Sequence, residues 1–394
     1  MKRVGIFQFE WPLQVHTTNL ALKLAEAGIQ VDIYLYACDT SLEKPSALSK
    51  HPNARFFIFD NNKSLVSRVV NRIVRDSRKI LGFPYRRAKT MLAVVDRTLK
   101  CIGSSKYDYF IGIEKAGLIW AGKLSEQLGV PYLYYSLELY IEGHPAVNGE
   151  SKFASIRSEE KTYHARAAGT IIQDALRSKV LFESNGIKTQ NTIYIPVSVS
   201  GKRVTEKSHF LHDRLGIPIT KKIILYMGMI AARRGINEMM QCATRLLEDY
   251  VIVFHGPVFS EFATDDNCGG KVYFSLGMVS SEDIPRLISS AHIGIAIYEN
   301  SNANERLTAF SSEKIAYYVQ SGLPIIVRHN ESYDMLMSKY RCGVQVEHIH
   351  QLPKAVEKID GDYACYRKNA FAAFDHYYSF DNNVRALTEY LSNH

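Results

Sequence analysis

The sequence predicts an α/β protein with two doubly wound, Rossmann-like domains that face a central cleft. Short runs of β-branched and aromatic residues alternate with helical patterns, which is typical of repeated strand–helix–strand units. This alternation stops at a Pro/Ser/Gly segment at 196–201 and restarts at residue 222. We expect a first domain over 1–197, a second over 206–372, and a C-terminal helix over 373–394 that could pack back on the first domain.

The expected strands are short runs in which apolar residues dominate. In the first domain they cover 4–9, 31–36, 55–59, 109–113, 132–136, 170–172 and 192–195, and in the second 222–226, 251–254, 272–274, 293–297 and 324–327. Helical periodicity predicts helices at 19–27, 118–127 and 371–391. Because ligands of such sheets bind beyond the carboxyl ends of the strands, the cleft between the two domains is the expected site.

The composition excludes several classes of protein. With 46% hydrophobic and 22% charged residues, the chain is neither disordered nor a coiled coil. Its six cysteines form no CxxC pair, so we expect neither a disulfide framework nor a zinc site, which indicates a reducing cytoplasm. No apolar stretch is long enough for a signal peptide core or a membrane-spanning helix. Asp360 and Asp362 flank a glycine in a predicted turn, and His348 and His350 lack further ligands, so no metal site is expected.

Most of the net charge of +8 lies in one segment. Between Lys63 and Lys100 the chain has eleven Lys or Arg residues and two acids. Apolar residues at helical spacing over 63–79 predict a basic amphipathic helix. Its polar faces carry Arg68, Arg72, Arg75 and Lys79. An anionic membrane surface suits such a helix, since each basic residue near that surface adds about 1 kcal/mol. An ordinary solvated basic face is the alternative, and no motif indicates nucleic acid.

The segment 222–247 carries the clearest chemical signal. A strand ends at Gly228, and the chain then passes through Arg233 and Arg234 into a helix that begins near Ile236. Bare backbone and fixed positive charge before a helix are what a diphosphate requires. An ordinary strand-to-helix turn, with Gly for a positive φ and Arg for solubility, is the alternative.

A second anion-binding pattern follows the strand at 293–297. Ser311 and Ser312 lie at the N-terminus of a predicted helix, where free N–H groups and the helix dipole favour negative charge, and Lys314 follows them. The Gly-Leu-Pro at 322–324 ends this helix before the next strand. A serine-capped helix without a ligand is the alternative.

The order and spacing of these two segments resemble the C-terminal half of glycosyltransferases with the GT-B fold, in particular the family-4-type group that uses nucleotide sugars. The resemblance covers most of 190–345. It implies that Gly228, Arg233 and Arg234 grip the donor diphosphate. It also implies that a further set of residues lies beside the phosphates and the nucleobase: Gly256, Met278, Ser311, Ser312, Glu313, Lys314 and Tyr317.

One feature of that family is displaced in this chain. The family usually has two Glu residues with seven residues between them, and the second, five residues before the Gly that ends the helix, binds the donor ribose. These two positions hold Ala309 and Tyr317 here. Glu305 and Glu313 have the same separation but are shifted by four residues. The donor sugar and the stereochemistry of transfer therefore stay open.

The first domain offers candidates for proton transfer at the carboxyl ends of its strands. Glu114 follows the strand at 109–113, Glu138 follows the strand at 132–136, and His16 is expected in the loop before the first helix. Either carboxylate could act as general base toward an acceptor hydroxyl, and His16 could contact donor phosphate or acceptor. A solvent-facing or ion-paired glutamate is the alternative.

The sequence as a whole predicts a glycosyltransferase that moves a sugar from a nucleotide diphosphate donor, expected to be UDP-linked, to a hydroxyl of a glycan or lipid-linked acceptor in surface polysaccharide assembly. Because cations and a helix N-terminus would neutralise the departing diphosphate, we expect no metal and no other cofactor. The expected location is cytoplasmic, peripheral on the inner face of the cell membrane. A sugar-nucleotide 2-epimerase and a non-catalytic relative that binds nucleotide sugar or scaffolds partners at the membrane are the alternatives.

Overall fold

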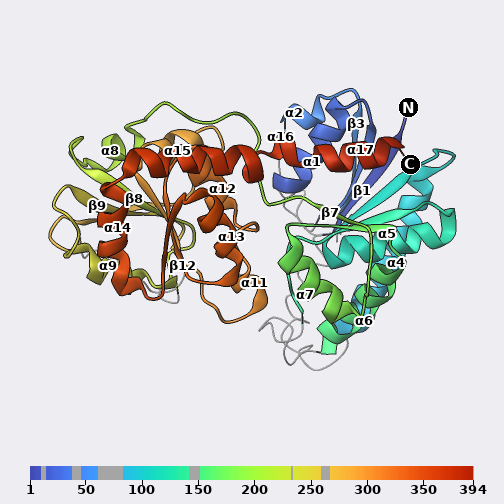
Figure 1. Ribbon diagram of the computed structural model, residues 1–394. Coiled ribbons are helices and arrows are strands. Elements are labelled where there is room, and N and C mark those ends of the chain that lie inside the picture. Colours follow the sequence, from blue (N-terminus) through green and yellow to red (C-terminus); the bar gives the residue numbers. More distant parts are fainter. Residues whose placement is uncertain are drawn as a thin grey trace, which may run out of the picture. The chain divides into compact units, whose positions relative to one another are not determined.

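The computed structural model of the protein describes residues 1–9, 15–37, 46–60, 83–141, 151–231, 234–258 and 267–393. The chain divides into two compact units: Met1–Ile195 with Val384–His394, and Pro196–Asn383. Each unit has one parallel sheet with helices packed on it (Figure 1). The predicted basic helix over 63–79, with Arg68, Arg72, Arg75 and Lys79, falls outside the described residues, as does Arg233.

The first unit is built on a seven-stranded sheet in the order β3-β2-β1-β4-β5-β6-β7, with every neighbouring pair parallel. Its strands are β1 (Arg3–Phe9), β2 (Gln30–Ala37), β3 (Ala54–Asp60), β4 (Tyr109–Ile113), β5 (Tyr132–Tyr135), β6 (Gly169–Ile172) and β7 (Thr192–Tyr194). The chain winds one way from β1 and the other way from β4, so this pair is the switch point, where such sheets bind ligands. Gln8 lies beside Ile113 at the carboxyl end of the pair.

Aromatic side chains fill the core of the first unit. The ring of Phe7 stacks on Tyr34 with 5.0 Å between centroids and lies 5.3 Å from Trp120. Close approach of α5 to the sheet depends on Gly117, where a Cβ would lie 2.3 Å from the Phe7 carbonyl oxygen. The helices are α1 (Val15–Glu26), α2 (Ser46–Ser49), α4 (Phe83–Ile102), α5 (Glu114–Leu128), α6 (Ser151–Arg166), α7 (Ala175–Asn185) and the last helix, α17 (Arg385–Asn393), red in Figure 1.

The second unit repeats this architecture with a six-stranded parallel sheet in the order β10-β9-β8-β11-β12-β13. Its strands are β8 (Lys222–Met227), β9 (Tyr250–Gly256), β10 (Val272–Leu276), β11 (Ile293–Ala296), β12 (Ile325–Arg328) and β13 (Gly343–Val346). The switch point lies between β8 and β11. Its helices are α8 (Phe210–Leu215), α9 (Ile236–Ala243), α10 (Ile284–Ser289), α11 (Ala303–Arg306), α12 (Glu313–Gln320), α13 (Glu331–Tyr340), α14 (Leu352–Asp360), α15 (Tyr363–Ala373) and α16 (Phe380–Asn383).

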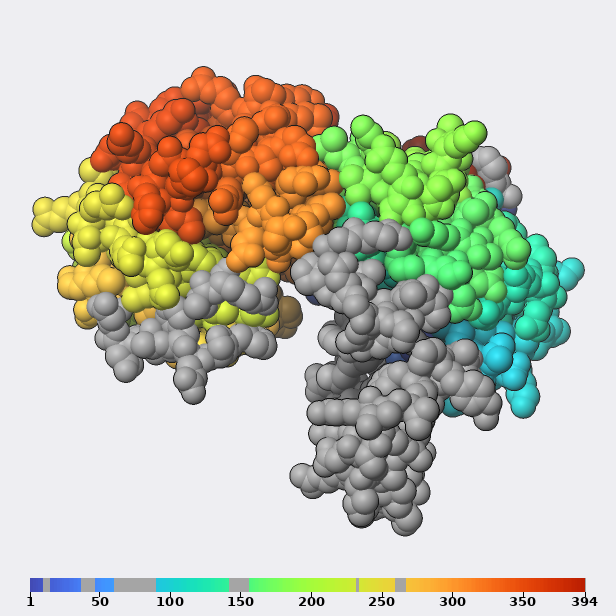
Figure 2. Space-filling model, turned by 90° about the horizontal axis from the view of Figure 1, so that it is seen from below, coloured from blue at the N-terminus to red at the C-terminus, as the bar shows by residue number. Residues whose placement is uncertain are grey.

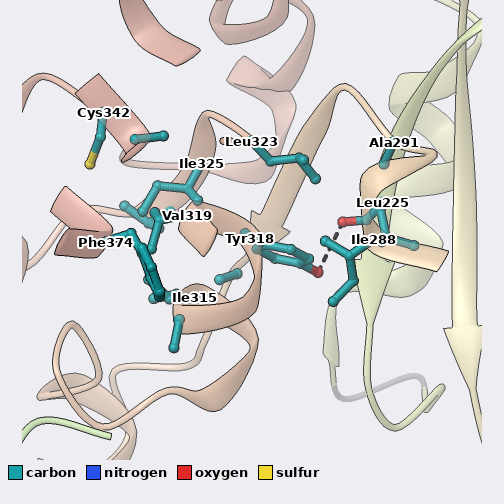
Figure 3. Packing of buried hydrophobic residues seen from close by; sticks show 14 of the residues in the cluster. Leu225, Ile288, Ala291, Ile315, Tyr318, Val319, Leu323, Ile325, Cys342 and Phe374 are labelled. Atoms are coloured by element: carbon teal, nitrogen blue, oxygen red, sulfur yellow. Dashed lines mark hydrogen bonds between the residues drawn. The ribbon is translucent and has the colours of Figure 1, made fainter. Parts of the chain in front are cut away.

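Tyr318 connects α12 to the strands at this switch point by packing and by hydrogen bonds. Its ring occupies space left by Gly294 of β11, where a Cβ would lie 2.3 Å from the ring. Its hydroxyl donates to the Leu225 carbonyl oxygen at 3.1 Å (Figure 3) and accepts from the Met227 N–H at 2.9 Å. The N-terminus of α12 is thereby held at the carboxyl ends of β8 and β11.

The predicted fold class is confirmed, and all twelve predicted strands are present. The sequence does not predict β13, because its four residues Gly343–Val346 include a glycine and a glutamine and lack a continuous apolar run. Within the described residues, no helix combines the length and the apolar character needed to span a bilayer.

Three predicted helix boundaries are wrong, and contacts between segments distant in the chain account for two of them. The first helix begins at Val15 and includes His16, since Thr17 of its first turn donates to Gln8 of β1. Helix α5 begins at Glu114 itself, directly after β4. The helix expected over 371–391 is broken by a π-helical turn, Phe374–Tyr378, and by Ser379. At this break the backbone of Tyr378 and Phe380 hydrogen-bonds to Val199 instead of continuing the helix.

Candidate functional site

Two glycines bring two loops together at the carboxyl edge of the second sheet. Gly228 follows β8 and Gly256 ends β9, with φ of 141° and 143°. The Gly228 N–H donates to the His255 carbonyl oxygen at 2.9 Å. A Cβ on Gly256 would lie 2.1 Å from the Gly228 carbonyl oxygen, so only glycine fits there. The result is bare backbone at the end of β8.

Lys314 lies directly against this backbone. Its Nζ is 3.3 Å from the place that a Cβ on Gly228 would take, and 4.8 Å from the ring centroids of Tyr226 and Tyr298. Within the described parts of the chain, this ammonium has no hydrogen bond and no ion pair. Burial lowers the pKa of Lys314 to about 7, and the positive charge of Arg234 acts in the same direction. Such a poorly solvated cation favours a bound anion.

The N-terminus of α12 adds a second attraction for negative charge. Ser312 precedes the helix, but its hydroxyl bonds to the Tyr298 hydroxyl at 2.6 Å and makes no capping hydrogen bond to the first turn. Ser311 turns away and donates to the Leu307 carbonyl oxygen at 3.0 Å. Burial raises the pKa of the Glu313 carboxyl and raises the pKa of Tyr317 to about 12. Lys314 thus faces the end of β8 from α12, and Ser312 is joined to Tyr298, whose ring lies 4.8 Å from Lys314 Nζ.

Arg234 lines a pocket of about 200 Å³ at the ends of β11 and β12. Its guanidinium lies 3.5 Å from Glu305 Oε1, and Glu305 Oε2 accepts from the Ser301 hydroxyl at 2.9 Å. The remaining lining residues are Gly235, Glu238, Ile297, Tyr298, Glu299, Arg328 and Ile349. Sequence reasoning does not single out Tyr298 or Arg328, and neither belongs to a recognised spacing pattern. The pocket offers both signs of charge around one aromatic ring.

The structure brings five of the ten predicted donor-site residues of the second unit near one another. Gly228, Gly256, Ser312 and Lys314 form one cluster, and Arg234 is near enough for its charge to act on Lys314. Met278 stands apart, 80% exposed after β10, two strands away from β8. Figure 2 shows one face of the molecule, on which yellow and orange segments of the second unit lie at the surface.

Glu114 is held in a strained conformation at the switch point of the first sheet. It follows β4 with φ of 57°, in the left-handed region that favours glycine. Its Oε1 accepts hydrogen bonds from the N–H groups of Leu137 (2.8 Å) and Glu138 (2.9 Å). Burial is the main cause that raises the pKa of Glu114 to about 7; the charge of Glu138 adds to the rise, whereas Lys115 and the two N–H groups oppose it. A carboxyl group that titrates near neutral pH is suited to act as a general base.

His16 lies at the same edge of the first sheet, beside the end of β1. Thr17, the next residue, donates to Gln8 Oε1 at 2.7 Å. Burial lowers the pKa of His16 to about 4, so its imidazole is neutral at pH 7. Among the described residues its Nδ1 has no hydrogen-bond partner. A neutral imidazole of this kind can donate or accept a hydrogen bond but supplies no charge.

Arg177 is a residue that sequence reasoning misses. It lies in the first turn of α7, is 0% exposed, and donates to the carbonyl oxygen of Leu137 at 2.8 Å. The sequence around it, a polar Gln173-Asp174 directly after a strand, gives only a weak signal of a buried polar site. Which charged side chain is buried depends on packing that spacing does not show.

The described residues contain no group of three or more His, Cys, Asp or Glu side chains that could hold a metal ion. Asp360, in the predicted turn, ends α14 and accepts from Lys222 Nζ at 2.8 Å and from the Tyr250 hydroxyl at 2.7 Å. It thus joins α14 to β8 and β9.

Solved structures with the same arrangement identify the fold. Sucrose-phosphate synthase from Thermosynechococcus elongatus is 15% identical, with a TM-score of 0.71 over 100% of this chain and 99% of that chain. HepE from Anabaena, in complex with UDP, is 14% identical, with a TM-score of 0.67 over 100% of both chains. The chain has the GT-B fold. The lipopolysaccharide outer core galactosyltransferase WaaB, 14% identical with a TM-score of 0.59 over 100% of both chains, is a third similar GT-B structure.

Sequence comparison adds one match to this GT-B assignment. Residues 250–375 match the family described as Glucosyltransferase 3-like, C-terminal domain. Curated proteins give no match to the chain. The resemblance to GT-B proteins drawn from the two anion-binding segments is thereby confirmed at the level of the fold.

Proposed function

We propose that this chain is a glycosyltransferase that takes a sugar from a UDP-linked donor and attaches it to an acceptor hydroxyl. The observation that carries the proposal is the Lys314 ammonium, which lies against the bare backbone of Gly228 and beside the N-terminus of α12, where the Ser312 side chain makes no cap. A diphosphate would supply the negative charge that this place attracts. The UDP bound to HepE and the enzyme names of the similar structures support a nucleotide sugar as donor.

In the proposed reaction, the acceptor oxygen forms a bond to the anomeric carbon while the bond from that carbon to the diphosphate oxygen breaks. Lys314, Arg234 and the α12 N-terminus stabilise the charge that develops on the departing diphosphate, and no metal is needed for this step. Glu114 takes the proton of the acceptor hydroxyl, because its pKa of about 7 leaves much of it ionised at neutral pH. His16 and Glu138 are proposed to orient the acceptor.

The acceptor is proposed to be a glycan or a lipid-linked glycan in surface polysaccharide assembly. This part of the proposal rests on the basic segment 63–79, which would hold the protein on the inner face of an anionic membrane where a lipid-linked acceptor lies.

A calorimetric and thermal-shift titration with nucleoside diphosphates and their sugar conjugates tests the donor site. UDP should bind the parent protein, and Lys314→Ala and Arg234→Ala should each weaken it by about tenfold to hundredfold, as expected for loss of a charged hydrogen bond. Lys221→Ala is the matched control, since Lys221 lies at the amino end of β8 and bonds to the Glu248 carbonyl oxygen. Folded protein that binds none of these nucleotides would rule out the proposed function.

Incubation with a UDP-sugar separates the reaction classes. A transferase forms product only when an acceptor sugar is added, whereas an epimerase converts the donor alone, and a binding protein does neither. Conversion of the donor without acceptor, or binding without any turnover across a panel of acceptors, would contradict the proposal.

A further inference from the structure

A buried arginine in the first unit hydrogen-bonds to the backbone segment that donates two hydrogen bonds to Glu114. Arg177 is 0% exposed. Its Nε donates to Gln173 Oε1 at 2.6 Å and its Nη2 to the Leu137 carbonyl oxygen at 2.8 Å. Burial lowers the pKa of Arg177, whereas the charges of Glu138, Asp174 and Glu114 raise it. A guanidinium keeps its charge in such places, so a buried positive charge lies within electrostatic reach of Glu114.

The segment 136–138 is anchored on both sides by this arrangement. On the carbonyl side, Ser136 accepts from Gln173 Nε2 at 2.8 Å, and Leu137 accepts from Arg177. On the amide side, the N–H groups of Leu137 and Glu138 point to Glu114 Oε1. Gln173 is 1% exposed, so both anchoring side chains lie in the interior, away from any substrate.

We propose that Arg177 is a positioning residue: it fixes the backbone segment 136–138 and thereby the place of the Glu114 carboxylate. Only the role of Glu114 as a general base rests on the proposed function. The hydrogen bonds that anchor the segment 136–138 lie within the first unit and do not depend on that function. Loss of Arg177 would free the two N–H groups and remove a nearby positive charge. Both changes disfavour the ionised form of Glu114, so its pKa should rise.

Several other groups act on Glu114 or feel its charge, and they must stay constant in the test. They are Lys115 of α5, Tyr134 and Tyr135 of β5, and Glu138 and Tyr140 after β5. Lys115 is itself paired with buried Glu160, at 3.5 Å. Arg177 differs from these groups because it combines a charge with a direct hydrogen bond to the anchored segment.

Infrared difference spectroscopy of the full chain measures the titration of Glu114 without any need for activity. The carboxyl band of Glu114 is assigned by its loss in Glu114→Gln, and its midpoint in the parent should lie at about 7. Arg177→Met should raise this midpoint by about 1 pH unit or more, because the two N–H groups that stabilise the carboxylate lose their anchored position. Arg177→Lys and Gln173→Leu keep the charge but lose part of the anchoring, so they should raise the midpoint by less.

Arg55→Met is the control for loss of a hydrogen-bonded arginine elsewhere in the same unit. Arg55 of β3 donates to Asp32 of β2 at 2.7 and 2.6 Å, and Asp32 is paired with Gly5 rather than with the carboxyl end of β1. This variant should be destabilised yet leave the Glu114 midpoint unchanged. An unchanged midpoint in folded Arg177→Lys and Gln173→Leu would overturn the inference, even if Arg177→Met does not fold.

The same variants separate this inference from the proposed function. If the protein transfers sugar, the acidic limb of the pH profile of kcat/KM should move with the infrared midpoint, while UDP binding in the second unit stays as in the parent. If the midpoint moves but no transfer occurs with any acceptor, Arg177 still positions Glu114 and the transferase proposal falls.

Discussion

Opposing effects act on the pKa of the Glu114 carboxyl group. Its surroundings exclude water, which favours the neutral form, while two backbone N–H groups and Lys115 favour the carboxylate. The result is a group that changes charge near pH 7. The cost of its left-handed backbone conformation, of order 1–3 kcal/mol, is a further sign that this geometry serves a function.

The first prediction concerns the pH dependence that follows from Glu114. A general base must be ionised, so kcat/KM should rise tenfold per pH unit below about 7 and then level off. Glu114→Gln should lower kcat by about 10²–10⁴-fold and abolish this acidic limb, with UDP affinity unchanged. Steady-state rates from pH 5.5 to 9 provide the check. A variant with the parent's pH profile would show that another group accepts the proton.

The second prediction concerns Lys314, whose pKa is lowered to about 7. A bound diphosphate favours the ammonium form and raises this pKa, so binding above pH 7 takes up a proton. The affinity for UDP should therefore fall as pH rises above 7 and should be nearly constant below it. Calorimetry in buffers of different ionisation enthalpy measures the proton uptake directly.

Lys314→Arg is the control for this proton uptake, because a guanidinium stays charged throughout the range. Its UDP affinity, whatever its size, should lose the dependence on pH above 7. If parent and Lys314→Arg take up the same number of protons, the titrating group lies elsewhere.

At the level of single residues, the sequence predicts which residues follow a strand or open a helix. It does not predict which groups surround each side chain in the folded protein. Glu114 and Glu138 are visible in the sequence because each follows a strand, and Ser312 and Lys314 because they open a helix. The positive φ of Glu114, its two N–H partners and the burial of Arg177 depend on contacts between segments far apart in the chain. Likewise, the ion pair between Arg234 and Glu305 depends on packing that spacing in the sequence does not show.

Among the elements, the loops after β8 and β9 make the sharpest stability prediction. Gly256→Ala would place a methyl group 2.1 Å from the Gly228 carbonyl oxygen, so one of the two loops must move. We expect a loss of about 1–3 kcal/mol in the free energy of unfolding, together with weaker UDP binding, because Gly228 is displaced from Lys314. Chemical denaturation and UDP titration measure the two effects.

Gly270→Ala is the matched control for a positive φ alone. Gly270 has φ of 83°, but a Cβ there meets nothing within 4 Å. It should cost about 1 kcal/mol and leave UDP binding unchanged. If both variants lose the same free energy of unfolding and the same UDP affinity, the backbone conformation of Gly256, and not its contact with Gly228, causes the losses in Gly256→Ala.

The elements themselves follow from periodicity more reliably than their ends do. Continuous apolar runs identify the central strands, whereas β13, with Gly343 and Gln345 among its four residues, carries no such run. The break before α17 has no strong local signal, since Phe374–Tyr378 holds neither proline nor glycine. It forms because Val199, in the segment 196–201 of the second unit, supplies alternative hydrogen bonds to the backbone.

Across the whole molecule, the same architectural rule applies twice. Each unit has a parallel sheet with one switch point, and the predicted functional residues collect there: Glu114 and His16 in the first unit, Gly228 and Lys314 in the second. The repeat could be predicted because the strand–helix alternation restarts after residue 200. In the proposed reaction the donor and acceptor chemistries belong to different units, which lets mutations test them separately.

The last prediction concerns the proposed membrane association of the chain. Changing Arg68, Arg72 and Arg75 to Glu removes three positive charges from the basic segment, each worth about 1 kcal/mol near an anionic surface. Binding to vesicles that contain phosphatidylserine should therefore fall by at least about 100-fold, with no binding to neutral vesicles in either case. Changing the exposed Lys179, Lys188 and Lys368 to Glu alters the net charge equally and should have a much smaller effect. Sedimentation with vesicles gives the comparison, and equal losses in the two triple variants would mean that net charge, rather than the segment 63–79, draws the protein to the membrane.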